Sequence, residues 1–310
     1  MANDKLRPMK ATEFDPDKAR FPGWASPKFD GLRCWAMAGG AFSNTLKTLP
    51  NRHVQQEFRR HAQTVTGLDG EIVVGEPNDP NVMQATTSGI MSQDGEPDFR
   101  YMVFDAWSLP HTDFADRKRA IEEFMMDLPP WITVVQHKWI TSQEELDAYE
   151  SEQLALGYEG VMYRCAEAGS KRNPEVKYKY GRSTVAEGFL LKVKRFSDAE
   201  AYIIGGEELM HNENEAAINE LGLTERSSCQ ENLVPSGMLG AYLVQAPEWP
   251  EPFKISCGSM THEERRAAWL RLPQDIGRPV TFKYFKHGVK VVPRHGIFKA
   301  YRDPIDITEY

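Results

Sequence analysis

The first segment with residue types suited to covalent chemistry is Lys28-Phe29-Asp30-Gly31-Leu32-Arg33. A lysine amine becomes a nucleophile once it has lost its proton, and neighbouring cations or desolvation favour that loss. Lys192 and Lys194, much later in the chain, are candidates for supplying such a field. Gly31 allows a tight backbone turn before the apolar run that follows. Lys28 is therefore the candidate nucleophile, although an exposed turn before a strand would produce the same pattern.

Four further clusters place charged or aromatic residues next to apolar runs. Asp69-Gly70-Glu71 and Glu159-Gly160 each put an acid before such a run, and the first can bind a ribose hydroxyl or a metal-bound water. Phe104-Asp105 ends another run, and its ring offers a face on which a base can stack. In a strand, Lys192 and Lys194 would share one face, where a phosphate would offset their repulsion. Each cluster alone also fits a hairpin turn, core packing or a lysine-protected edge strand.

The order of these clusters is more informative than any one of them. Lys-x-Asp-Gly, Asp-Gly-Glu, Phe-Asp, Glu-Gly and Lys-x-Lys follow one another, each attached to a strand-like run. This order resembles the motifs of the covalent nucleotidyltransferase superfamily, which contains ATP-dependent DNA ligases, RNA ligases and mRNA capping enzymes. The run Pro293–Asp303 is similar to the last motif of DNA ligases, and Ser43–Asn51 is similar to a segment of bacteriophage and algal-virus ligases. The chain thus resembles a minimal ATP-dependent DNA ligase over nearly its whole length.

The resemblance implies an α+β fold with two domains. Residues 1–195 would form the nucleotidyltransferase (adenylation) domain, and residues 196–310 would form an OB-fold β-barrel. Residues 207–236 are similar in position to the latch with which the algal-virus ligase encircles DNA, although a disordered surface loop is the alternative. The chain before Lys28 is too short for the extra DNA-binding domain of cellular ligases.

The resemblance also implies a role for each motif residue. AMP joined to Lys28 would pass to the 5′-phosphate of a nick, and the 3′-hydroxyl would then displace it. The implied ATP-binding residues also include Lys28 and Glu159. Arg33 and Glu71 would hold the ribose, Phe104 would stack on adenine, and Lys192 and Lys194 would hold the α-phosphate. Arg294 and Arg302 would orient the pyrophosphate. Of these, Lys28, Lys192, Lys194 and Arg302 would be catalytic. The implied ligands for Mg²⁺ or Mn²⁺ are Asp30, Glu71 and Glu159, and the candidate DNA-binding residues are Lys47, Arg52, Arg182 and Arg195.

Asn44 departs from the family pattern, because an arginine implicated in holding the nick 5′-phosphate usually stands there. A dianionic phosphate cannot be desolvated beside an amide alone, so another cation is expected. Lys47 keeps the usual spacing from Ser43, and Arg52 begins the next expected helix. Because a helix N-terminus favours phosphate and an arginine adds a bidentate contact, Arg52 is the preferred substitute.

Hydrophobic periodicity predicts a mixture of strands and helices up to about residue 195 and mainly strands after it. The expected strands are Leu32–Met37, Gly70–Val74, Tyr101–Asp105, Ile132–Val135, Gly160–Tyr163, Phe189–Val193, Ala201–Ile204, Leu239–Val244, Phe253–Ser256, Val280–Phe285 and Val289–Val292. The expected helices are Arg52–Ala62, Phe114–Met126 and Gln143–Leu156, the last preceded by the capping-box pattern Ser142-x-x-Glu145.

Charge and composition bear on the partners and the compartment. The formal net charge is −8, but basic runs at 171–195 and 276–302 coincide with the motifs, which favours nicked duplex DNA as a partner. A solvated face is the ordinary explanation of either run. No apolar stretch approaches the roughly 20 residues that span a bilayer, and the four cysteines form no CxxC pair that would indicate zinc. We expect an intracellular monomer, in the cytoplasm of a bacterial host if the chain is viral, as its small size suggests.

Two other functions remain open at this point. An RNA ligase or capping guanylyltransferase of the same superfamily shares most of the motifs, although Ser43–Asn51 and Pro293–Asp303 favour a DNA ligase. A non-catalytic nucleic-acid-binding module is a different class, and the complete set of acids and lysines argues against it. A nicotinamide-dependent ligase is disfavoured because the zinc-type cysteine cluster is missing from the sequence.

Overall fold

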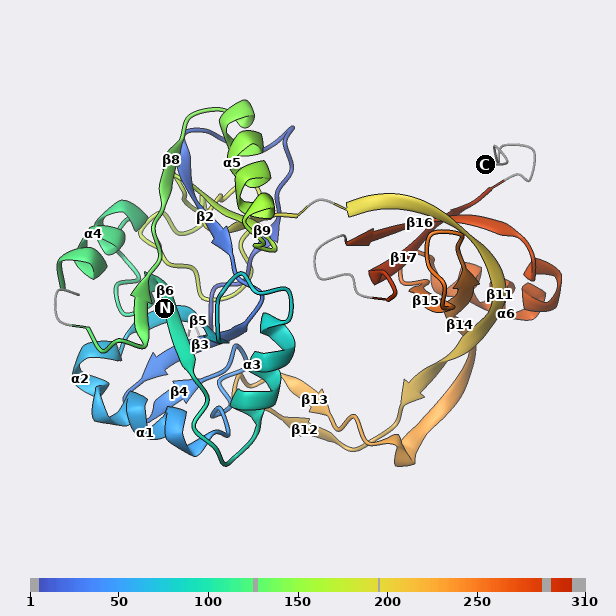
Figure 1. Ribbon diagram of the computed structural model, residues 1–310, viewed down its shortest axis with the longest axis horizontal. Coiled ribbons are helices and arrows are strands. Elements are labelled where there is room, and N and C mark those ends of the chain that lie inside the picture. The colour runs from blue at the N-terminus through green and yellow to red at the C-terminus, as the bar shows by residue number, and fades with distance from the viewer. Residues whose placement is uncertain (1–5, 125–127, 195, 286–290, 303–310) are drawn as a thin grey trace. The chain divides into compact units, whose positions relative to one another are not determined.

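The chain forms two compact units in a computed structural model that describes residues 6–124, 128–194, 196–285 and 291–302. Unit 1 comprises residues 1–194 together with 219–223, and unit 2 comprises residues 195–218 and 224–310. Figure 1 shows unit 1 in blue to yellow-green, built from helices around two sheets, and unit 2 in yellow to red, built mainly from strands.

The first sheet of unit 1 carries Lys28 at the end of one of its strands. Its order is β1 (Thr12–Glu13), β10 (Leu191–Val193), β9 (Gly160–Cys165), β2 (Gly23–Lys28) and β8 (Lys138–Ile140). Helix α5 (Gln143–Ala155) packs on this sheet (Figure 1), because Leu146 of the helix joins Ala25 and Val161 of the strands in one buried cluster. The helix begins as the capping pattern predicts, with the Ser142 hydroxyl accepting a hydrogen bond from the Glu145 N–H at 3.3 Å.

The second sheet of unit 1 carries the next two motifs, Asp69-Gly70-Glu71 and Phe104-Asp105. Its order is β4 (Gly40–Phe42), β3 (Leu32–Met37), β5 (Leu68–Val74), β6 (Phe99–Ala106) and β7 (Ile132–Val134). The remaining helices of the unit are α1 (Arg52–Arg60), α2 (Ala62–Val65), α3 (Val82–Met91) and α4 (Phe114–Phe124). Phe58 of α1 and Ile90 of α3 are fully buried with Tyr101 of β6, so these helices cover the apolar face of the sheet.

Unit 2 is a five-stranded barrel with one long helix. The barrel closes in the order β11 (Phe196–Asn212), β14 (Leu233–Gln245), β15 (Phe253–Ser256), β17 (Arg294–Tyr301) and β16 (Pro279–Phe285). Helix α6 (His262–Asp275) contributes Ala268 to the barrel core. Residues 207–236 form the ends of β11 and β14, the hairpin β12 (Ala216–Ile218) and β13 (Thr224–Arg226), and a short 3₁₀ turn, Gln230–Asn232. Within the described residues, no helix is long and apolar enough to cross a membrane.

Some element boundaries differ from the expected ones. The helix expected over 52–62 ends at Arg60, where the His61 N–H closes the last turn. The strand expected over 189–193 is shorter, Leu191–Val193. The strand expected over 289–292 is wrong in its described part, because residues 291 and 292 precede β17. Pro293, which has no N–H for a strand ladder, separates them from it. Residues 125, 126, 289 and 290 of these predictions lie outside the described residues.

Several elements were not expected from the sequence, among them β2, α3 and α6. Strand β2 contains Gly23, Ser26 and Pro27, which are poor strand formers, and it forms because β9 pairs along its whole length. Helix α3 is rich in threonine and contains a glycine, so its local helix propensity is low. Helix α6 contains Pro273, which obscured its pattern, although its N-terminus carries a complete capping box from Thr261 to Glu264.

Candidate active site

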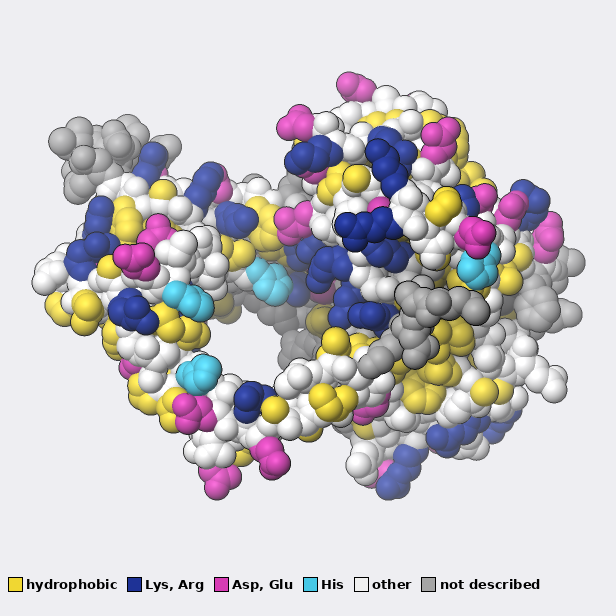
Figure 2. All heavy atoms as spheres, turned by 180° about the vertical axis from the view of Figure 1, so that it is seen from behind, with side chains coloured by type: hydrophobic (Ala, Val, Ile, Leu, Met, Phe, Trp, Pro, Cys, Tyr) yellow, Lys and Arg dark blue, Asp and Glu magenta, His cyan; other side chains and the backbone are white. Residues whose placement is uncertain are grey.

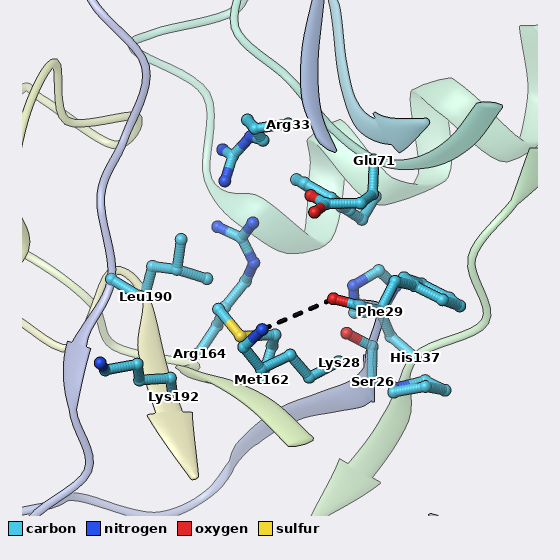
Figure 3. Close-up of a pocket in the computed structure, with 13 residues that line it drawn as sticks. Ser26, Lys28, Phe29, Arg33, Glu71, His137, Met162, Arg164, Leu190 and Lys192 are labelled. Atoms are coloured by element: carbon cyan, nitrogen blue, oxygen red, sulfur yellow. Dashed lines mark hydrogen bonds between the residues drawn. The ribbon is translucent and has the colours of Figure 1, made fainter. Parts of the chain in front are cut away.

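A pocket in unit 1 brings the motifs of the two sheets together. Lys28 ends β2 of the first sheet, and the chain crosses directly to Arg33 in β3 of the second, so the first motif bridges both. The pocket is lined by Ala11, Ser26, Pro27, Lys28, Phe29, Arg33, Glu71, Phe104, His137, Met162, Arg164, Leu190 and Lys192. Figure 3 shows Arg33 and Glu71 on the opposite side of this pocket from Lys192. The sequence did not single out Ser26, His137, Met162 or Leu190.

Lys28 is held by a buried carboxylate. Because Lys28 pairs with Gly160 across the β2–β9 register, its ammonium group forms an ion pair with Glu159. The other oxygen of Glu159 accepts from the Lys194 ammonium at 2.6 Å. Burial raises the pKa of Glu159, but the two lysines outweigh burial and hold that pKa below its usual value. Glu159 thus remains an anion between two cations.

Lys192 and Lys194 do not share one anion in this structure. Lys192 lines the pocket, and its Nζ atom lies 3.4 Å from Oε1 of Glu13 in β1. Lys194 follows the end of β10 and contacts Glu159 instead. Lys192 thus faces the pocket, and Lys194 contacts the carboxylate that holds Lys28; their joint role at a phosphate stays a prediction.

Arg33 is fixed by the first acid of the Asp-Gly-Glu motif. Its Nε and Nη2 atoms donate to the two carboxylate oxygens of Asp69, each at 2.6 Å, and the Tyr178 hydroxyl donates to the same carboxylate at 2.6 Å. Asp69 is fully buried. The guanidinium group of Arg33 also lies over the Phe104 ring, with its Cζ atom 4.7 Å from the ring centroid. Asp69 therefore positions Arg33 and only Glu71 of this motif lines the pocket.

Glu71 lies opposite Arg33 in the β3–β5 register. Burial raises the pKa of Glu71 to about 7, although the positive charges of Lys28 and Arg33 oppose this. Gly31 is required here by close approach rather than by a left-handed turn. A Cβ at Gly31 would lie 2.5 Å from the Ile72 carbonyl oxygen, so any larger residue would push the strand that carries Glu71.

We expect Glu71→Gln to be more stable than the wild type at pH 8, because a neutral amide avoids the burial of an ionised carboxylate. The native pKa of Glu71, about 7, lies above the reference value of 4.5. Between these two pKa values the folded protein keeps a proton on Glu71 that the unfolded chain has lost. The stability that comes from a neutral Glu71 is therefore complete below pH 4.5 and is lost as the pH rises through 7. The two proteins should match near pH 4.5 and differ by on the order of 2–3 kcal/mol at pH 8. Urea unfolding across this range, with chelator present, measures it; a pH-independent difference would contradict it.

Behind Phe104 lies a buried ion network. Asp105 is fully buried and accepts from Arg117 Nε at 2.7 Å, and its other oxygen lies 2.8 Å from Arg164 Nη1. Burial raises the pKa of Asp105, but the two guanidinium groups outweigh it and lower that pKa. Arg164 ends the motif that begins at Glu159, and its side chain lines the pocket (Figure 3). Sequence reasoning singled out Asp105 but neither arginine.

The three candidate metal ligands come from both sheets. Glu71 lies in β5 of the second sheet, Glu159 directly precedes β9 of the first, and Asp30 lies between β2 and β3. In the described part of the chain, no three His, Cys, Asp or Glu side chains gather as a metal site. The assignment of Asp30, Glu71 and Glu159 to a metal ion therefore stays a prediction.

Three of the four candidate DNA-binding residues are exposed side chains of unit 1. Arg52 begins α1 and forms an exposed ion pair with Asp94 at 2.9 Å. Lys47 is exposed in the loop that precedes this helix, and Arg182 donates to the Ala11 carbonyl at 2.8 Å. Arg195 lies outside the described residues. Figure 2 shows Lys and Arg side chains gathered on parts of the surface despite the net negative charge.

In unit 2, the basic residues of the last motif are paired with acids of β11. Arg302 Nε donates to Glu200 at 2.8 Å, and Lys299 forms an ion pair with Asp198. These pairs border an open pocket on the barrel. Arg294 begins β17, opposite Phe285 of β16.

Comparison with known proteins gives a consistent picture. Residues 234–302 match the family model of the DNA ligase OB-like domain. Two structures of Chlorella virus DNA ligase-adenylate are 27% and 28% identical to the chain, with TM-scores of 0.52 and 0.51. Each comparison covers 96% of this chain and 99% of the other. A Lig E DNA ligase, 23% identical with a TM-score of 0.68 and the same coverage, shares the fold. A sequence comparison with curated proteins gives no match.

Together, the fold and the pocket define an α+β nucleotidyltransferase unit followed by an OB-type barrel, which confirms the predicted fold class. Within that class, the chain resembles the minimal ATP-dependent DNA ligases, as the order of its motifs predicted.

Proposed function

We propose that this protein is an ATP-dependent DNA ligase that seals nicks with a 5′-phosphate and a 3′-hydroxyl in duplex DNA. The observation that carries the proposal is the position of Lys28. It ends a strand at the pocket in which all five motifs meet, and the ion pair with Glu159 holds its amine in place. Two of the solved structures similar to this chain are described as a DNA ligase-adenylate, which supports a covalent nucleotide at this pocket.

The proposed reaction has three balanced steps. The unprotonated Lys28 amine attacks the α-phosphorus of ATP, forming an N–P bond while pyrophosphate leaves with the electrons of the broken P–O bond, and the nitrogen loses one proton. An oxygen of the nick 5′-phosphate then attacks the same phosphorus, the N–P bond breaks, and Lys28 leaves as an amine that has taken up a proton. The 3′-hydroxyl finally attacks the 5′-phosphorus, loses its proton and displaces AMP. Lys192 faces the pocket as a cation for the α-phosphate, and Lys194 keeps Glu159 in position.

The nucleoside binds between the two sheets in this proposal. Arg33 covers one face of the Phe104 ring, so an adenine that stacks on this ring uses the other face. Glu71 and Arg33 bind the ribose hydroxyls, and the bidentate contact with Asp69 fixes the direction of Arg33. Glu159 would hold a hydrated Mg²⁺ or Mn²⁺, with Asp30 contacting its waters, and the ion would neutralise charge on the phosphates.

DNA is bound by both units of a monomeric chain in this proposal. Residues 1–195 form the adenylation domain, residues 196–310 form the OB domain, and 207–236 form a latch. The exposed Arg52 and Lys47 supply the cation that Asn44 cannot, with Arg182 and Arg195 as further phosphate contacts. The ion pair with Asp94 is exposed and therefore weak, so a phosphate can replace it at Arg52. The proposed location is the compartment that holds the DNA, inside the cell.

Arg302→Ala should slow the labelling of Lys28 by ATP far more than the sealing of a nick that already carries AMP. Orientation of pyrophosphate by Arg302 and Arg294 matters only in the first step. One charge-assisted hydrogen bond contributes about 1.5–3 kcal/mol, which corresponds to roughly a 10- to 100-fold loss in rate. Single-turnover rates of both steps measure the effect. Arg266→Ala, an exposed arginine on α6, is the matched control, and equal losses in both steps would rule out the role.

The proposed function is tested by incubating the protein with radiolabelled ATP and Mg²⁺, followed by a nicked DNA duplex. We expect AMP bound to the denatured protein, its transfer to a 5′-phosphorylated nick, and a sealed strand. A nick with a 5′-hydroxyl should remain unsealed. Labelling by GTP alone would indicate a capping enzyme, sealing of RNA alone would indicate an RNA ligase, and no labelling would indicate a non-catalytic binding module.

A further inference from the structure

His137 is a polar residue of the pocket wall that the motifs do not include. It lies between β7 and β8 and lines the pocket with Met162 (Figure 3). Phe104 lines the same pocket. Its ring meets the Phe114 ring edge-on, with the centroids 5.0 Å apart. Neither ring nitrogen meets the distance and angle limits of a hydrogen bond among the residues that the structure describes, although the Val135 carbonyl lies close enough to raise the pKa of the ring, and both nitrogens are shielded from water.

A buried polar group without a partner destabilises a fold, so such a group calls for an explanation. The charged side chains that act on His137 already have partners: Arg164 contacts Asp105, and Lys118 contacts Glu122. Burial lowers the pKa of His137 to about 3, and the nearby positive charge of Arg164 adds to this effect. The ring is therefore neutral at physiological pH, with one nitrogen that donates and one that accepts.

We propose that His137 determines the choice of base by accepting a hydrogen bond from the 6-amino group of the purine. This inference rests on the proposed use of ATP. Phe104 and Met162 supply apolar surfaces for the faces of a base, whereas His137 supplies a polar group for its edge. The second torsion of a histidine side chain is broad, so the ring can turn a nitrogen toward an entering base.

The same geometry disfavours guanine. Guanine carries an oxygen at position 6, which requires a donor, whereas adenine carries an amine, which requires an acceptor. When the ring N–H stays directed at the Val135 carbonyl, the other nitrogen satisfies the amine, and that nitrogen would face the guanine oxygen without a hydrogen between them. A site that leaves a buried acceptor unpaired rejects the wrong ligand more strongly than an apolar wall does.

The test combines a change in the protein with a change in the base. Wild type and His137→Leu are each incubated with ATP and with purine riboside triphosphate, which lacks the 6-amino group. Intact-protein mass spectrometry follows the covalent addition of nucleotide, and the initial slope gives kcat/KM. His137→Leu should lower kcat/KM for ATP about 10-fold, the value of roughly one hydrogen bond. For purine riboside triphosphate the loss should stay below about 2-fold, because the deleted bond is absent there.

Controls separate this contact from a purely structural role. His137→Gln retains an acceptor and should keep more of the preference for ATP than His137→Leu does. His137→Phe keeps a ring against Phe114 and gives the same comparison if the leucine variant fails to fold. His262→Leu, at an exposed histidine that begins α6, should leave both nucleotides unaffected. The thermal midpoint of His137→Leu should equal or exceed that of the wild type, because an unpartnered polar ring is removed.

The outcomes distinguish this inference from the proposed function. Equal losses with both nucleotides would show that His137 does not contact the amine and would overturn the inference, while ATP labelling would still support a ligase. No labelling of the wild type by either nucleotide would overturn the proposed function itself.

Discussion

Lys28→Ala is expected to abolish covalent attachment of AMP. The first chemical step requires an amine at the α-phosphorus, and no other lysine ends a strand at the pocket beside a buried carboxylate among the described residues. Lys192 also lines the pocket, but it emerges from β10 and contacts Glu13 instead of Glu159. Radiolabelled AMP retained on the denatured protein measures the effect, and labelling should fall to background.

Two matched variants separate the nucleophile from the charge. Lys28→Arg keeps a cation beside Glu159, but a guanidinium stays protonated and cannot attack, so labelling should also vanish. Lys18→Ala removes an exposed lysine paired with Asp15 and should be labelled normally. All three proteins should seal a pre-adenylated nick, because that step does not need a free amine. Normal labelling of Lys28→Ala would exclude this residue as the site of attachment.

The motif residues could be predicted from sequence because each motif is local. Lys28, Glu71 and Phe104 are each marked by neighbours within a few residues, and all three line the pocket. Their convergence depends on strand pairing over long distances in the chain, such as Lys28 with Gly160 and Arg33 with Glu71. No local pattern encodes such pairing, so the ordered set of motifs indicated one site without showing its geometry.

The partners of the buried acids could not be predicted in the same way. Asp69 and Asp105 belong to residue types that are usually exposed, yet both are fully buried. Tyr178 reaches Asp69 from 109 positions further along the chain, and its neighbours have no periodic pattern. His137 was missed for a related reason, since a single histidine between two short strands resembles any loop residue. Burial decided the role of each of these residues, and burial is a property of the fold.

Proline and long-range pairing explain two of the errors in the expected secondary structure, at β2 and α6. Pro27 made β2 look like a loop, but β8 pairs only with Gly23–Ala25, so the proline lies where that neighbour has ended. Pro273 near the end of α6 obscured a helix whose capping box was readable in the sequence. Helix starts are marked by local hydrogen bonds and can be recognised, whereas a strand such as β2 depends on its neighbours.

Asp105→Ala should destabilise unit 1 by about 3–5 kcal/mol, the usual cost of removing one partner from a buried ion network. The change would leave Arg117 and Arg164, which are 1% and 3% exposed, without their carboxylate. Desolvated guanidinium groups cannot lose their charge, so the cost cannot be relieved by deprotonation. Arg164 lines the pocket, and the loss should therefore also weaken nucleotide binding. Urea unfolding followed by circular dichroism measures the free energy of unfolding.

The pH dependence and a surface control make the Asp105 prediction specific. The pKa of Asp105 is lowered in the folded protein, so its stabilisation is present above the unfolded pKa, near 3.8, and is lost as the pH falls through the lower folded value. The deficit of Asp105→Ala should therefore be constant from pH 5 to 8 and shrink only in strong acid. Asp116→Ala breaks an exposed pair with Arg119 and should cost less than about 0.5 kcal/mol. If Asp105→Ala costs no more than this control, Arg117 and Arg164 do not depend on Asp105, and the buried network does not support the wall of the pocket.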